Sequence, residues 1–348
     1  MKKQNQNDEL VFLPLGGSNE VGMNLNAYGF GPAHDRKWII VDVGVTFGDQ
    51  STPGVDVIVP DPSFLEGENI LGIVLTHAHE DHIGALGWLW PRIQAPLYAT
   101  PFTAFLIREK LRDAGIYEDV ELHEAPLGST VNLGPFEVTY VTITHSIAEP
   151  NGLAIKTPLG TVLHTGDWKI DNDPVVGERT DVDFIQKLGD EGVLAMVCDS
   201  TNVFVDGVAG SEGDVKVKLA ELIQGLKGRV AVGCFASNVA RMHSVISAAE
   251  AAGRRVALAG RSMHRITAAA KSVGMLNDIK PFLSEQEAKV WPADEILYLC
   301  TGSQGEARAA LSRVAEGTHP FIKLGEGDHC IFSSRVIPGN ELLSLIHI

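Results

Sequence analysis

The first half of the chain alternates short apolar runs with Gly, Pro and Asp residues. Runs of this kind are typical of β-strands joined by turns. Four of them predict strands, at Val11–Leu15, Trp38–Val43, Val138–Ile143 and Leu153–Lys156. One helix is expected among these strands, near Thr103–Ala114. We therefore expect a mainly β structure between residues 10 and 200.

After residue 205 the pattern changes to alternating strands and helices. Apolar residues recur at helical spacing from Ser211 to Leu226, which predicts the first helix. Further strands and helices are expected in turn at Arg229–Cys234, Val239–Ala252, Val256–Gly260, His264–Val273, Ile296–Cys300 and Glu306–Ala315. This alternation predicts a parallel sheet flanked by helices. We therefore predict two domains, residues 1–204 and 205–348, without a Pro- or Ser-rich linker between them.

The composition is that of an ordinary globular protein, but the charge is unevenly distributed. Hydrophobic residues make up 45% of the 348 positions and charged residues 21%, and the net charge is −16. Residues 1–204 carry 12 Lys and Arg against 29 Asp and Glu, a balance of −17. Residues 205–348 carry 16 against 15, a balance of +1. Most of these basic residues are expected on solvated helix faces, and the composition neither requires nor excludes a polyanionic substrate.

Targeting signals and cysteines favour a cytoplasmic protein. The N-terminal MKKQNQNDEL turns polar and acidic where a signal peptide would become apolar, and no apolar run approaches the roughly 20 residues of a membrane span. Cys198, Cys234, Cys300 and Cys330 are far apart and form no CxxC pair. We expect buried free thiols in a reducing compartment, with no disulfide and no thiolate metal site.

Four candidate metal ligands lie within six residues, directly after the apolar run Ile70–Leu75. They are His77, His79, Asp81 and His82. A loop after a buried strand can direct all four side chains into one pocket, and imidazole and carboxylate ligands suit Zn²⁺ or Mn²⁺. The alternative is a polar loop that carries histidines by chance. With only 12 His in 348 residues, this density favours a metal site that can hold two ions.

Three further strands end in residues that can bind or orient a metal ion. Asp42 follows one strand and is expected either to cap a turn or to orient a metal-bound histidine. His145 and Asp167 follow two others, and Gly166 allows a tight turn before the aspartate. The predicted two-metal set has His77, His79 and His145 on one ion, Asp81 and His82 on the other, and Asp167 bridging them. His164 is interpreted as a structural residue.

These residues resemble the metallo-β-lactamase superfamily and, within it, the β-CASP nucleases of the bacterial ribonuclease J family. The HxHxDH stretch indicates the superfamily alone, whereas the later motifs are more specific. The resemblance extends along nearly the whole chain through Leu15–Asn24, Thr76–Gly84, His164–Lys169, Asp199–Asn202, Phe235–Val239, Gly260–Met263, Thr301–Glu306, Ile331–Ser334 and Ile337–Glu341. It implies an αββα metallo-β-lactamase sandwich followed by a β-CASP domain.

The resemblance also implies an activity and roles for individual residues. Members of the family are 5′-to-3′ exonucleases and endonucleases of RNA that use two divalent ions, with Zn²⁺ favoured and Mn²⁺ as the alternative. It implies the ligand set given above, catalytic roles for Asp81, Asp167 and Asp199, and a substrate contact at Ala236, Ser237 and Asn238. Considered singly, Asp199 and Ser237 are more simply interpreted as helix caps. The implied partner is single-stranded RNA with a 5′-monophosphate end, and no membrane is involved. A homo-oligomer is possible for the full-length protein, but the sequence does not give the oligomeric state.

The end of the chain departs from the family pattern. Family members continue past the Pro338-Gly339-Asn340-Glu341 motif into a Ser-Gly-His segment and a further metal-binding His, whereas this sequence ends at Ile348. Neither His329 nor His347 fits those roles. We therefore expect a truncated chain whose sandwich and β-CASP domain are incomplete, with one metal ligand missing, an open sheet edge and impaired stability or activity.

Two other functions stay open at this point. One is a small-molecule hydrolase of the lactonase or thioesterase type, which explains the His and Asp cluster but not the motifs after residue 205. The other is a non-catalytic fragment that binds RNA through the second domain. A turnover assay with a lactone or thioester separates the first from a nuclease, and RNA binding without cleavage supports the second.

Overall fold

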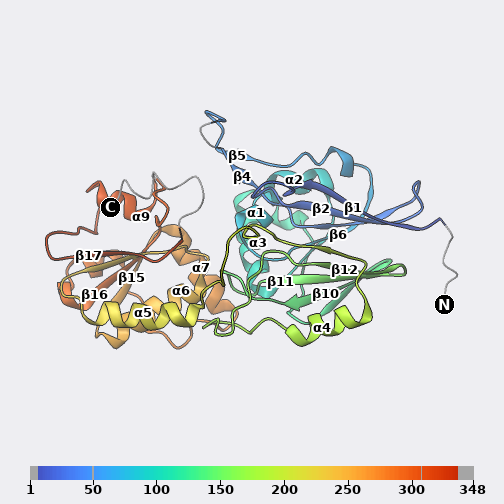
Figure 1. Cartoon of the computed structure of the whole chain (residues 1–348). Coiled ribbons are helices and arrows are strands. Elements are labelled where there is room, and N and C mark those ends of the chain that lie inside the picture. Colours follow the sequence, from blue (N-terminus) through green and yellow to red (C-terminus); the bar gives the residue numbers. More distant parts are fainter. Residues whose placement is uncertain (1–6, 49–50, 307, 336–348) are drawn as a thin grey trace. The chain divides into compact units, whose positions relative to one another are not determined.

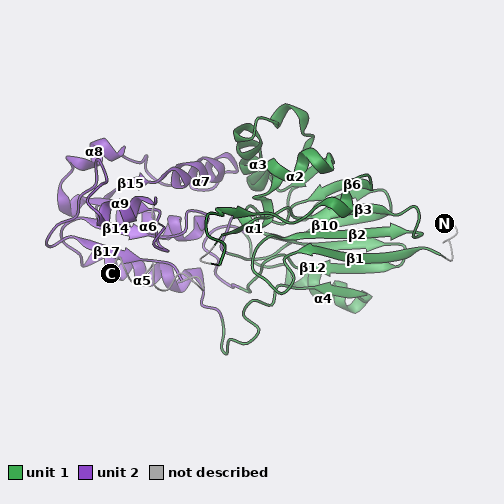
Figure 2. Ribbon diagram, turned by 90° about the horizontal axis from the view of Figure 1, so that it is seen from above, with its two compact units in different colours: residues 1–145, 149–170, 178–208 green, residues 146–148, 171–177, 209–348 purple. Residues whose placement is uncertain are grey.

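The computed structural model describes residues 7–48, 51–306 and 308–335. The chain divides into two compact units (Figure 2). Unit 1 consists of Met1–His145, Glu149–Ile170 and Glu178–Val208, and unit 2 of Ser146–Ala148, Asp171–Gly177 and Ala209–Ile348. The domain assignment 1–204 and 205–348 stays a prediction. The Ile337–Glu341 motif, the tail after it and the first six residues of MKKQNQNDEL lie outside the described residues.

Unit 1 is built on two sheets that pack face to face (Figure 1). The first has the order β1 (Glu9–Gly16), β2 (Leu25–Gly31), β3 (Lys37–Val41), β6 (Asn69–Val74), β7 (Leu97–Ala99) and β8 (Leu122–Glu124). The second has the order β13 (Ala195–Val197), β12 (Gly160–His164), β11 (Asn151–Thr157), β10 (Phe136–Thr142) and β9 (Thr130–Leu133). A separate ribbon pairs β4 (Thr46–Phe47) with β5 (Val57–Ile58).

Apolar side chains from both sheets form one core between them. Tyr28 and Val41 of the first sheet share a buried cluster with Phe136, Tyr140 and Leu153 of the second. Burial of this area at roughly 25 cal/mol per Å² is the main force holding the sheets together. This core holds β6, β10 and β12 in fixed positions. The residues that follow these three strands are therefore held close together.

Helices cover the outer faces of the two sheets. The helices of unit 1 are α1 (Glu80–Ile83), α2 (Leu86–Ile93), α3 (Pro101–Asp113) and α4 (Val182–Glu191), with 3₁₀ turns η1 (Ser63–Leu65) and η2 (Tyr117–Asp119). The helix α3 contacts α2, β7 and β8 of the first sheet. Leu188 of α4 packs on Val141 and Ala154 of the second sheet. Unit 1 therefore has four layers in the order α, β, β, α.

Unit 2 contains a parallel sheet of four strands with helices around it. The strand order is β15 (Arg255–Ala259), β16 (Ile296–Cys300), β14 (Val230–Gly233) and β17 (His329–Phe332). The helices are α5 (Glu212–Gln224), α6 (Val239–Ala251), α7 (Arg261–Ser272), α8 (Glu285–Lys289) and α9 (Ala310–Ala315), with a 3₁₀ turn η3 (Ala293–Glu295). One buried cluster joins Ala231, Tyr298 and Leu311 from two strands and α9.

The predicted α/β fold class is confirmed, because unit 1 has the four-layer sandwich and unit 2 the parallel sheet. The expectation of a single helix in the first half was wrong, since α1, α2 and α4 also form there. Pro91 lies inside α2, which obscured its helical pattern. The helix expected from Glu306 begins only at Ala310.

The cysteines are free thiols, as expected, but not all of them are buried. Cys234 and Cys300 are buried in the sheet of unit 2, and burial raises the pKa of the Cys234 thiol to about 12. Cys330 is exposed on β17 and Cys198 is only partly buried, so the expectation of burial was wrong for these two residues. Within the described residues, every helix is too short or too polar to cross a lipid bilayer.

Candidate metal centre

All six predicted ligands come together at one end of the sandwich in unit 1. His77 and His79 lie in the loop between β6 and α1, and Asp81 and His82 lie in α1 itself. His145 and Asp167 follow β10 and β12 of the facing sheet, so the two sheets contribute ligands to the same place. Residues as far apart in the sequence as His77 and Asp167 are thereby brought together, with ligand atoms within 4.8 Å of each other.

The first group contains three imidazoles and one carboxylate. One ligand atom from each of His77, His79, His145 and Asp167 lies within 4.8 Å of all the others. Nδ1 of His79 is 3.1 Å from Nε2 of His77 and 3.2 Å from Nε2 of His145. Nε2 of His145 is 3.6 Å from Oδ2 of Asp167.

The second group shares Asp167 with the first. Its members are Asp81, His82 and Asp167, again within 4.8 Å of one another. Nε2 of His82 lies 3.5 Å from Oδ2 of Asp81 and 3.4 Å from Oδ1 of Asp167. The two oxygens of Asp167 therefore face different groups, which is the arrangement that a bridging carboxylate requires.

The charge state of the first group suits a metal ion. Burial, reinforced by the neighbouring imidazoles, lowers the pKa of His77 well below its ordinary value. Burial likewise lowers the pKa of His79 to about 3 and lowers that of His145. These side chains are therefore neutral near pH 7, which is the form in which imidazole binds a metal.

The second group is rich in negative charge. Although burial acts to lower it, the pKa of His82 is raised well above its ordinary value because the carboxylates of Asp42, Asp81 and Asp167 surround the ring. Burial opposes ionisation of Asp81 and Asp167, but neighbouring imidazoles, His82 above all, hold the pKa of both carboxyls low. A cation bound at Nε2 of His82 would displace a proton from the ring and meet the carboxylates of Asp81 and Asp167.

The donor spacing fits divalent metal ions. Nitrogen ligands bound at roughly 2.0–2.1 Å in a tetrahedral zinc site lie about 3.3 Å from one another. The spacings of 3.1 and 3.2 Å among His77, His79 and His145 are close to this value. The residues present are thus able to hold a divalent ion in the first group, with the carboxylates of the second group suited to another.

Asp42 and Thr76 orient His77 and His82 through contacts with their Nδ1 atoms, on the side of each ring away from the ligand atom. The carboxylate of Asp42 accepts hydrogen bonds from the backbone N of Thr76 at 2.8 Å and from Nδ1 of His82 at 2.7 Å. The hydroxyl of Thr76 lies 2.9 Å from Asp42 and 3.0 Å from Nδ1 of His77. When this hydroxyl donates to Asp42 and accepts from Nδ1 of His77, Nε2 of His77 is left unprotonated for a metal.

Asp42 holds this position in an unusual backbone conformation. Its φ is +63°, which a non-glycine residue rarely adopts, and its side chain is fully buried. Two roles were expected for Asp42, the capping of a turn and the orientation of a histidine. Its contacts fit the second. The sequence did not indicate Thr76, because a hydroxyl at the end of a strand has no distinctive pattern until its partners are known.

A cavity of about 670 Å³ opens beside the second group. Asp81, His82, Asp167 and Asp199 line it together with the loop 17–22. The side chain of Asp199 accepts hydrogen bonds from the backbone N and the hydroxyl of Thr201, at 2.9 and 2.6 Å. These bonds close a turn and not a helix end, because the next helix, α5, begins only at Glu212, so the alternative of Asp199 as a helix cap was wrong. Asp199 lies in the wall of the cavity, and its catalytic role stays a prediction.

The predicted substrate segment lies in unit 2, where β14 leads into α6. Asn238 caps α6 by accepting from the backbone N of Arg241 at 2.8 Å, and its amide donates to Glu212 at 3.2 Å. Its side chain is therefore committed to structural bonds. Ala236 and Ser237 are half-buried in the turn before it, and the substrate contact at residues 236–238 stays a prediction.

His164 is buried, and its contacts are those of a structural residue. Its Nδ1 is 2.9 Å from the hydroxyl of Tyr28 within the core of unit 1. Burial lowers the pKa of His164 to about 4, so the ring is neutral at pH 7. The interpretation of His164 as structural agrees with this geometry.

Comparisons with known proteins identify relatives for both units. Residues 26–185 match the metallo-beta-lactamase superfamily, and residues 227–346 match the family described as "Ribonuclease J, beta-CASP domain". The chain is 49% identical over 338 residues to Ribonuclease J of Sinorhizobium meliloti, covering 97% of this chain and 60% of that protein. It is 44% identical over 332 residues to Ribonuclease J of Mycolicibacterium smegmatis, covering 94% of this chain and 58% of the relative.

The fold also has a solved counterpart. A protein of unknown function from Enterococcus faecalis superimposes with a TM-score of 0.61 at 17% identity, covering 83% of this chain and 76% of that one. At this identity the likeness concerns the fold alone. The chain spans about 60% of the length of the curated relatives named above.

Proposed function

Since the chain belongs to the ribonuclease J family of β-CASP metallo-β-lactamase proteins, we propose that it hydrolyses RNA phosphodiester bonds in a metal-dependent reaction. One observation carries the proposal above all. Two groups of ligand-type side chains, which follow strands of both sheets of unit 1, have Asp167 in common. A site of this form suits a hydrolysis in which charge develops on phosphate oxygens.

The chain's own residues have distinct parts in this reaction. His77, His79 and His145 would hold one ion, Asp81 and His82 the other, and Asp167 would contact both. Two ions at such a site supply an activated water and neutralise charge on the reacting phosphate. Asp42 and Thr76 orient His82 and His77, and Asp81 would also help to position the attacking water.

We favour Zn²⁺ for these ions, with Mn²⁺ as the alternative. Four imidazoles and two carboxylates form the ligand set, and nitrogen-rich sites of this kind suit zinc. Carboxylates and water also suit manganese, so metal content has to be measured in the purified protein. We further propose single-stranded RNA with a 5′-monophosphate as the substrate and the cytoplasm as the location.

The test is cleavage of a 5′-monophosphorylated, 3′-end-labelled RNA with Mn²⁺ or Zn²⁺. We expect RNA cleavage by the wild-type chain and none by the Asp81→Ala/His82→Ala variant. Release of mononucleotides would identify exonuclease action, and internal fragments would identify endonuclease action. A lactone and a thioester are assayed in parallel, and turnover of either without RNA cleavage would replace the nuclease by a small-molecule hydrolase.

Whether this chain holds both ions is a separate question. The metal content of the purified chain answers it, since the two groups together would hold two ions. Binding of RNA by a folded, metal-loaded chain that does not cleave it would support the non-catalytic alternative. Cleavage by that chain would contradict the non-catalytic alternative.

A further inference from the structure

Two motifs that have no part in the metal centre meet at one cavity of unit 2. Gly260–Met263 follows β15, and Thr301–Glu306 follows β16. The cavity has a volume of about 910 Å³ and is lined by residues of both segments. It lies at the carboxyl ends of two neighbouring parallel strands, which is where open α/β sheets bind their ligands.

Close packing between the two segments fixes the wall of this cavity. Gly260 has a φ of +113°, and a Cβ atom there would lie 2.4 Å from the Thr301 hydroxyl oxygen. A Cβ atom at Gly302 would lie 2.8 Å from the Cβ of Ala309. Glycine is therefore required at both positions, and the side chains beside them are held on a defined backbone.

The lining concentrates positive charge. Arg261, Arg265, Arg308 and Arg313 all face the cavity, with two histidines among their neighbours. Within residues 7–48, 51–306 and 308–335, the guanidinium groups of Arg261, Arg308 and Arg313 have no hydrogen bond or ion pair. Three unneutralised guanidinium groups around one cavity create a site for an anion.

Two carboxylates in the lining, Glu285 and Glu306, offset part of this charge, but four arginines outnumber them. Glu306 accepts a hydrogen bond from the backbone N of Gln304 at 3.0 Å. Glu285 lies 3.8 Å from Nε2 of His319, which is itself buried. Neither carboxylate forms an ion pair with Arg261, Arg308 or Arg313 in the described part of the chain.

The first turn of α7 carries positive charge, which destabilises the N-terminal end of a helix. Arg261 is its first residue, and His264 and Arg265 follow within little more than a turn, with no acidic residue in the first turn and no side-chain cap. Helix N-termini favour acidic residues, since the helix dipole is positive there. A local arrangement that opposes stability in this way is typical of residues kept for binding.

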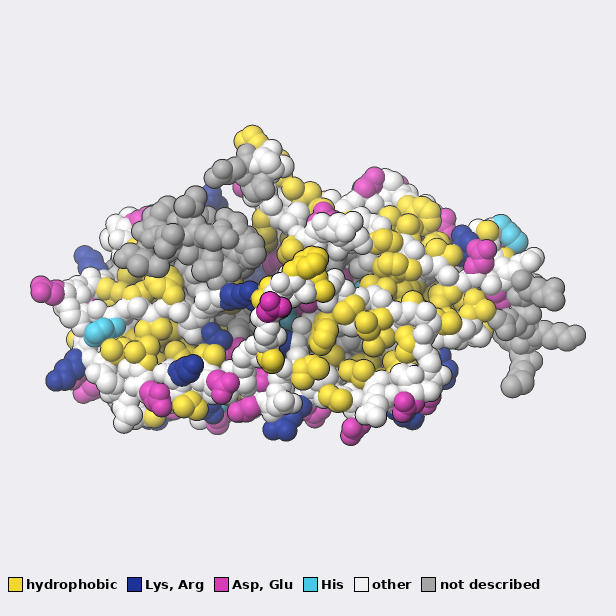
Figure 3. All heavy atoms as spheres, viewed as in Figure 1, with side chains coloured by type: hydrophobic (Ala, Val, Ile, Leu, Met, Phe, Trp, Pro, Cys, Tyr) yellow, Lys and Arg dark blue, Asp and Glu magenta, His cyan; other side chains and the backbone are white. Residues whose placement is uncertain are grey.

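The chemistry of the lining indicates phosphate groups as the ligand. The side chains that line this cavity include no Phe, Tyr or Trp on which a base could stack. Over the face of the molecule shown in Figure 3, basic and acidic side chains are interspersed, so positive charge does not form one continuous patch there. We propose that this arginine-lined cavity binds the phosphate backbone of single-stranded RNA outside the metal centre, an inference that rests on the ribonuclease function proposed above.

The test measures RNA affinity without cleavage. Binding of a fluorescein-labelled 20-nucleotide oligouridine is followed by anisotropy in EDTA at several salt concentrations. We expect the Arg261→Gln/Arg308→Gln/Arg313→Gln variant to bind at least about 10-fold more weakly than wild type. The slope of log affinity against log salt should fall by about 2, since each phosphate contact to a single strand contributes roughly 0.7.

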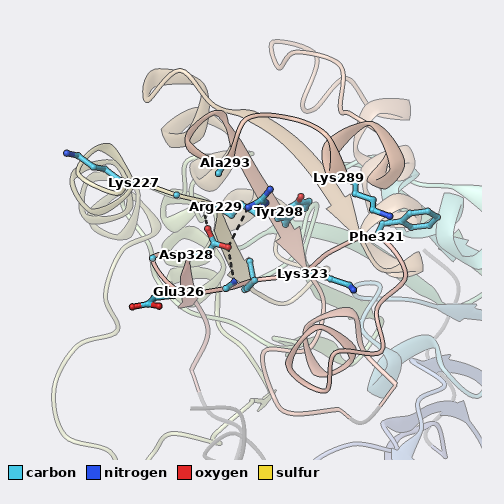
Figure 4. A pocket seen from close by; sticks show the side chains of 13 residues that line it. Lys227, Arg229, Lys289, Ala293, Tyr298, Phe321, Lys323, Glu326 and Asp328 are labelled. Carbon is cyan, nitrogen blue, oxygen red and sulfur yellow. Dashed lines mark hydrogen bonds and ion pairs between the residues drawn. The ribbon is translucent and has the colours of Figure 1, made fainter.

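A second set of basic residues in the same unit supplies the matched control. Lys227, Lys289 and Lys323 line another pocket, at the opposite, amino-terminal ends of the strands, with Lys227 on one side and the other two across from it (Figure 4). The Lys227→Gln/Lys289→Gln/Lys323→Gln variant removes the same charge and is expected to change affinity less than about twofold. Equal losses in the two triple variants would mean general electrostatic attraction and overturn the proposal.

Further variants keep the test decisive. All three arginines are exposed, and circular dichroism checks that each variant is folded. The Arg261→Lys/Arg308→Lys/Arg313→Lys variant should keep the salt slope but lose part of the affinity, because lysine cannot bind phosphate through two parallel hydrogen bonds. Single Arg→Gln variants should each lose about two- to fivefold, and unchanged affinity in all of them overturns the proposal.

The outcome is separable from that of the proposed function. A wild-type chain that binds RNA through these arginines but does not cleave it would contradict the nuclease activity and leave the cavity's role intact. A chain that cleaves RNA equally well with and without the three arginines would support the nuclease activity and contradict the role of the cavity. Oligoadenylate should bind within about twofold of oligouridine, since backbone contacts carry no sequence information.

Discussion

Nδ1 of His82 lies 2.7 Å from the carboxylate of Asp42, and both side chains are almost fully buried. This contact fixes the ring so that its other nitrogen, Nε2, faces Asp81 and Asp167. Asp42 is 40 residues earlier in the chain and follows a different strand, β3. The pairing therefore determines the direction in which a ligand of the second group points.

Replacing Asp42 should weaken metal binding without removing a ligand. The Asp42→Asn variant keeps the size of the side chain, but its amide has one acceptor oxygen for the three groups that now donate to Asp42. Loss of such supporting contacts typically costs 10- to 100-fold in metal affinity. We expect a loss in that range when Zn²⁺ is titrated against a chelating dye.

The control for this variant is Asp56→Asn, which makes the same change in charge at an exposed position of unit 1. Its zinc affinity should equal that of wild type. If Asp42→Asn also binds zinc as wild type does, the orientation of His82 does not depend on Asp42.

Metal stoichiometry should separate the two groups. His145→Ala removes a ligand from the first group only and Asp81→Ala from the second only, whereas Asp167→Ala affects both. We expect Asp167→Ala to retain the least metal by mass spectrometry after dialysis, and the first group to bind more tightly because it has three imidazoles. His34→Ala, at an exposed site, should retain the wild-type content, and equal metal loss in the three ligand variants would contradict two distinct groups.

His164 predicts how the stability of the metal-free protein depends on pH. Its pKa is about 4 in the folded state against 6.5 for the ordinary side chain, so the unfolded chain binds the proton more readily between these values. Stability is thus fully present above pH 6.5 and is lost as the pH falls towards 4. This difference in pKa corresponds to roughly 3–4 kcal/mol, at about 1.4 kcal/mol for each pH unit.

Urea unfolding in EDTA between pH 4 and 7 measures this contribution. The His164→Gln variant cannot titrate but can still form a hydrogen bond with Tyr28. We expect its free energy of unfolding to fall less steeply with acidification than that of wild type. Parallel curves for the two proteins would mean that His164 does not take up a proton on unfolding.

The metal centre was the most predictable part of the molecule, because four of its six side chains are neighbours in the sequence. The strand ends pointed to His145 and Asp167, but only the fold brings them to the same place. Thr76 and the backbone around Asp42 could not be predicted in the same way. Their importance depends on which side chains they contact in the folded protein, and the spacing of residues in the sequence does not predict those contacts.

The same division applies to the secondary structure. The helix α6 was predicted over Val239–Ala252 and forms over Val239–Ala251, because its apolar residues recur at helical spacing without interruption. The helix α2 escaped prediction because Pro91 lies inside it and no side chain caps it. Short elements of this kind are stabilised by tertiary packing, which a local pattern does not contain.

A buried ion pair in unit 2 should be important for its stability. Arg241 of α6 contacts both carboxylate oxygens of Glu212, at 3.0 and 3.1 Å, and also donates to the backbone oxygen of Ser333 at 2.7 Å. Both side chains are largely buried. Arg241→Ala should lower the free energy of unfolding by about 3–5 kcal/mol, since it removes the opposite charge from the buried carboxylate of Glu212.

The double variant Arg241→Met/Glu212→Leu distinguishes the pair from its parts. Replacing both charges by apolar side chains is often neutral, so the double variant should recover most of the stability lost in Arg241→Ala. Denaturant unfolding of the three proteins measures this recovery. A double variant as unstable as Arg241→Ala would show that other lost hydrogen bonds, such as those with Ser333 and Asn238, and not the buried charge of Glu212, account for the loss.

Gly44 should be indispensable because two ligand-bearing segments meet there. The loop after β3 is joined to α1 by backbone hydrogen bonds, among them Val43 N to His82 O at 2.7 Å and Val45 N to Glu80 O at 3.0 Å. A Cβ atom at Gly44 would lie only 1.6 Å from the backbone oxygen of Asp81, so the backbone itself would have to move.

Gly44→Ala should therefore displace Asp81 and His82 together and reduce both thermal stability and metal content. Gly189→Ala is the matched control, because a Cβ atom there meets nothing within 4 Å and the residue lies inside α4. Alanine favours a helix by about 1 kcal/mol over glycine, so the control should be more stable than wild type. Metal retention by a Gly44→Ala protein that melts at the wild-type temperature would contradict the close approach of these two segments.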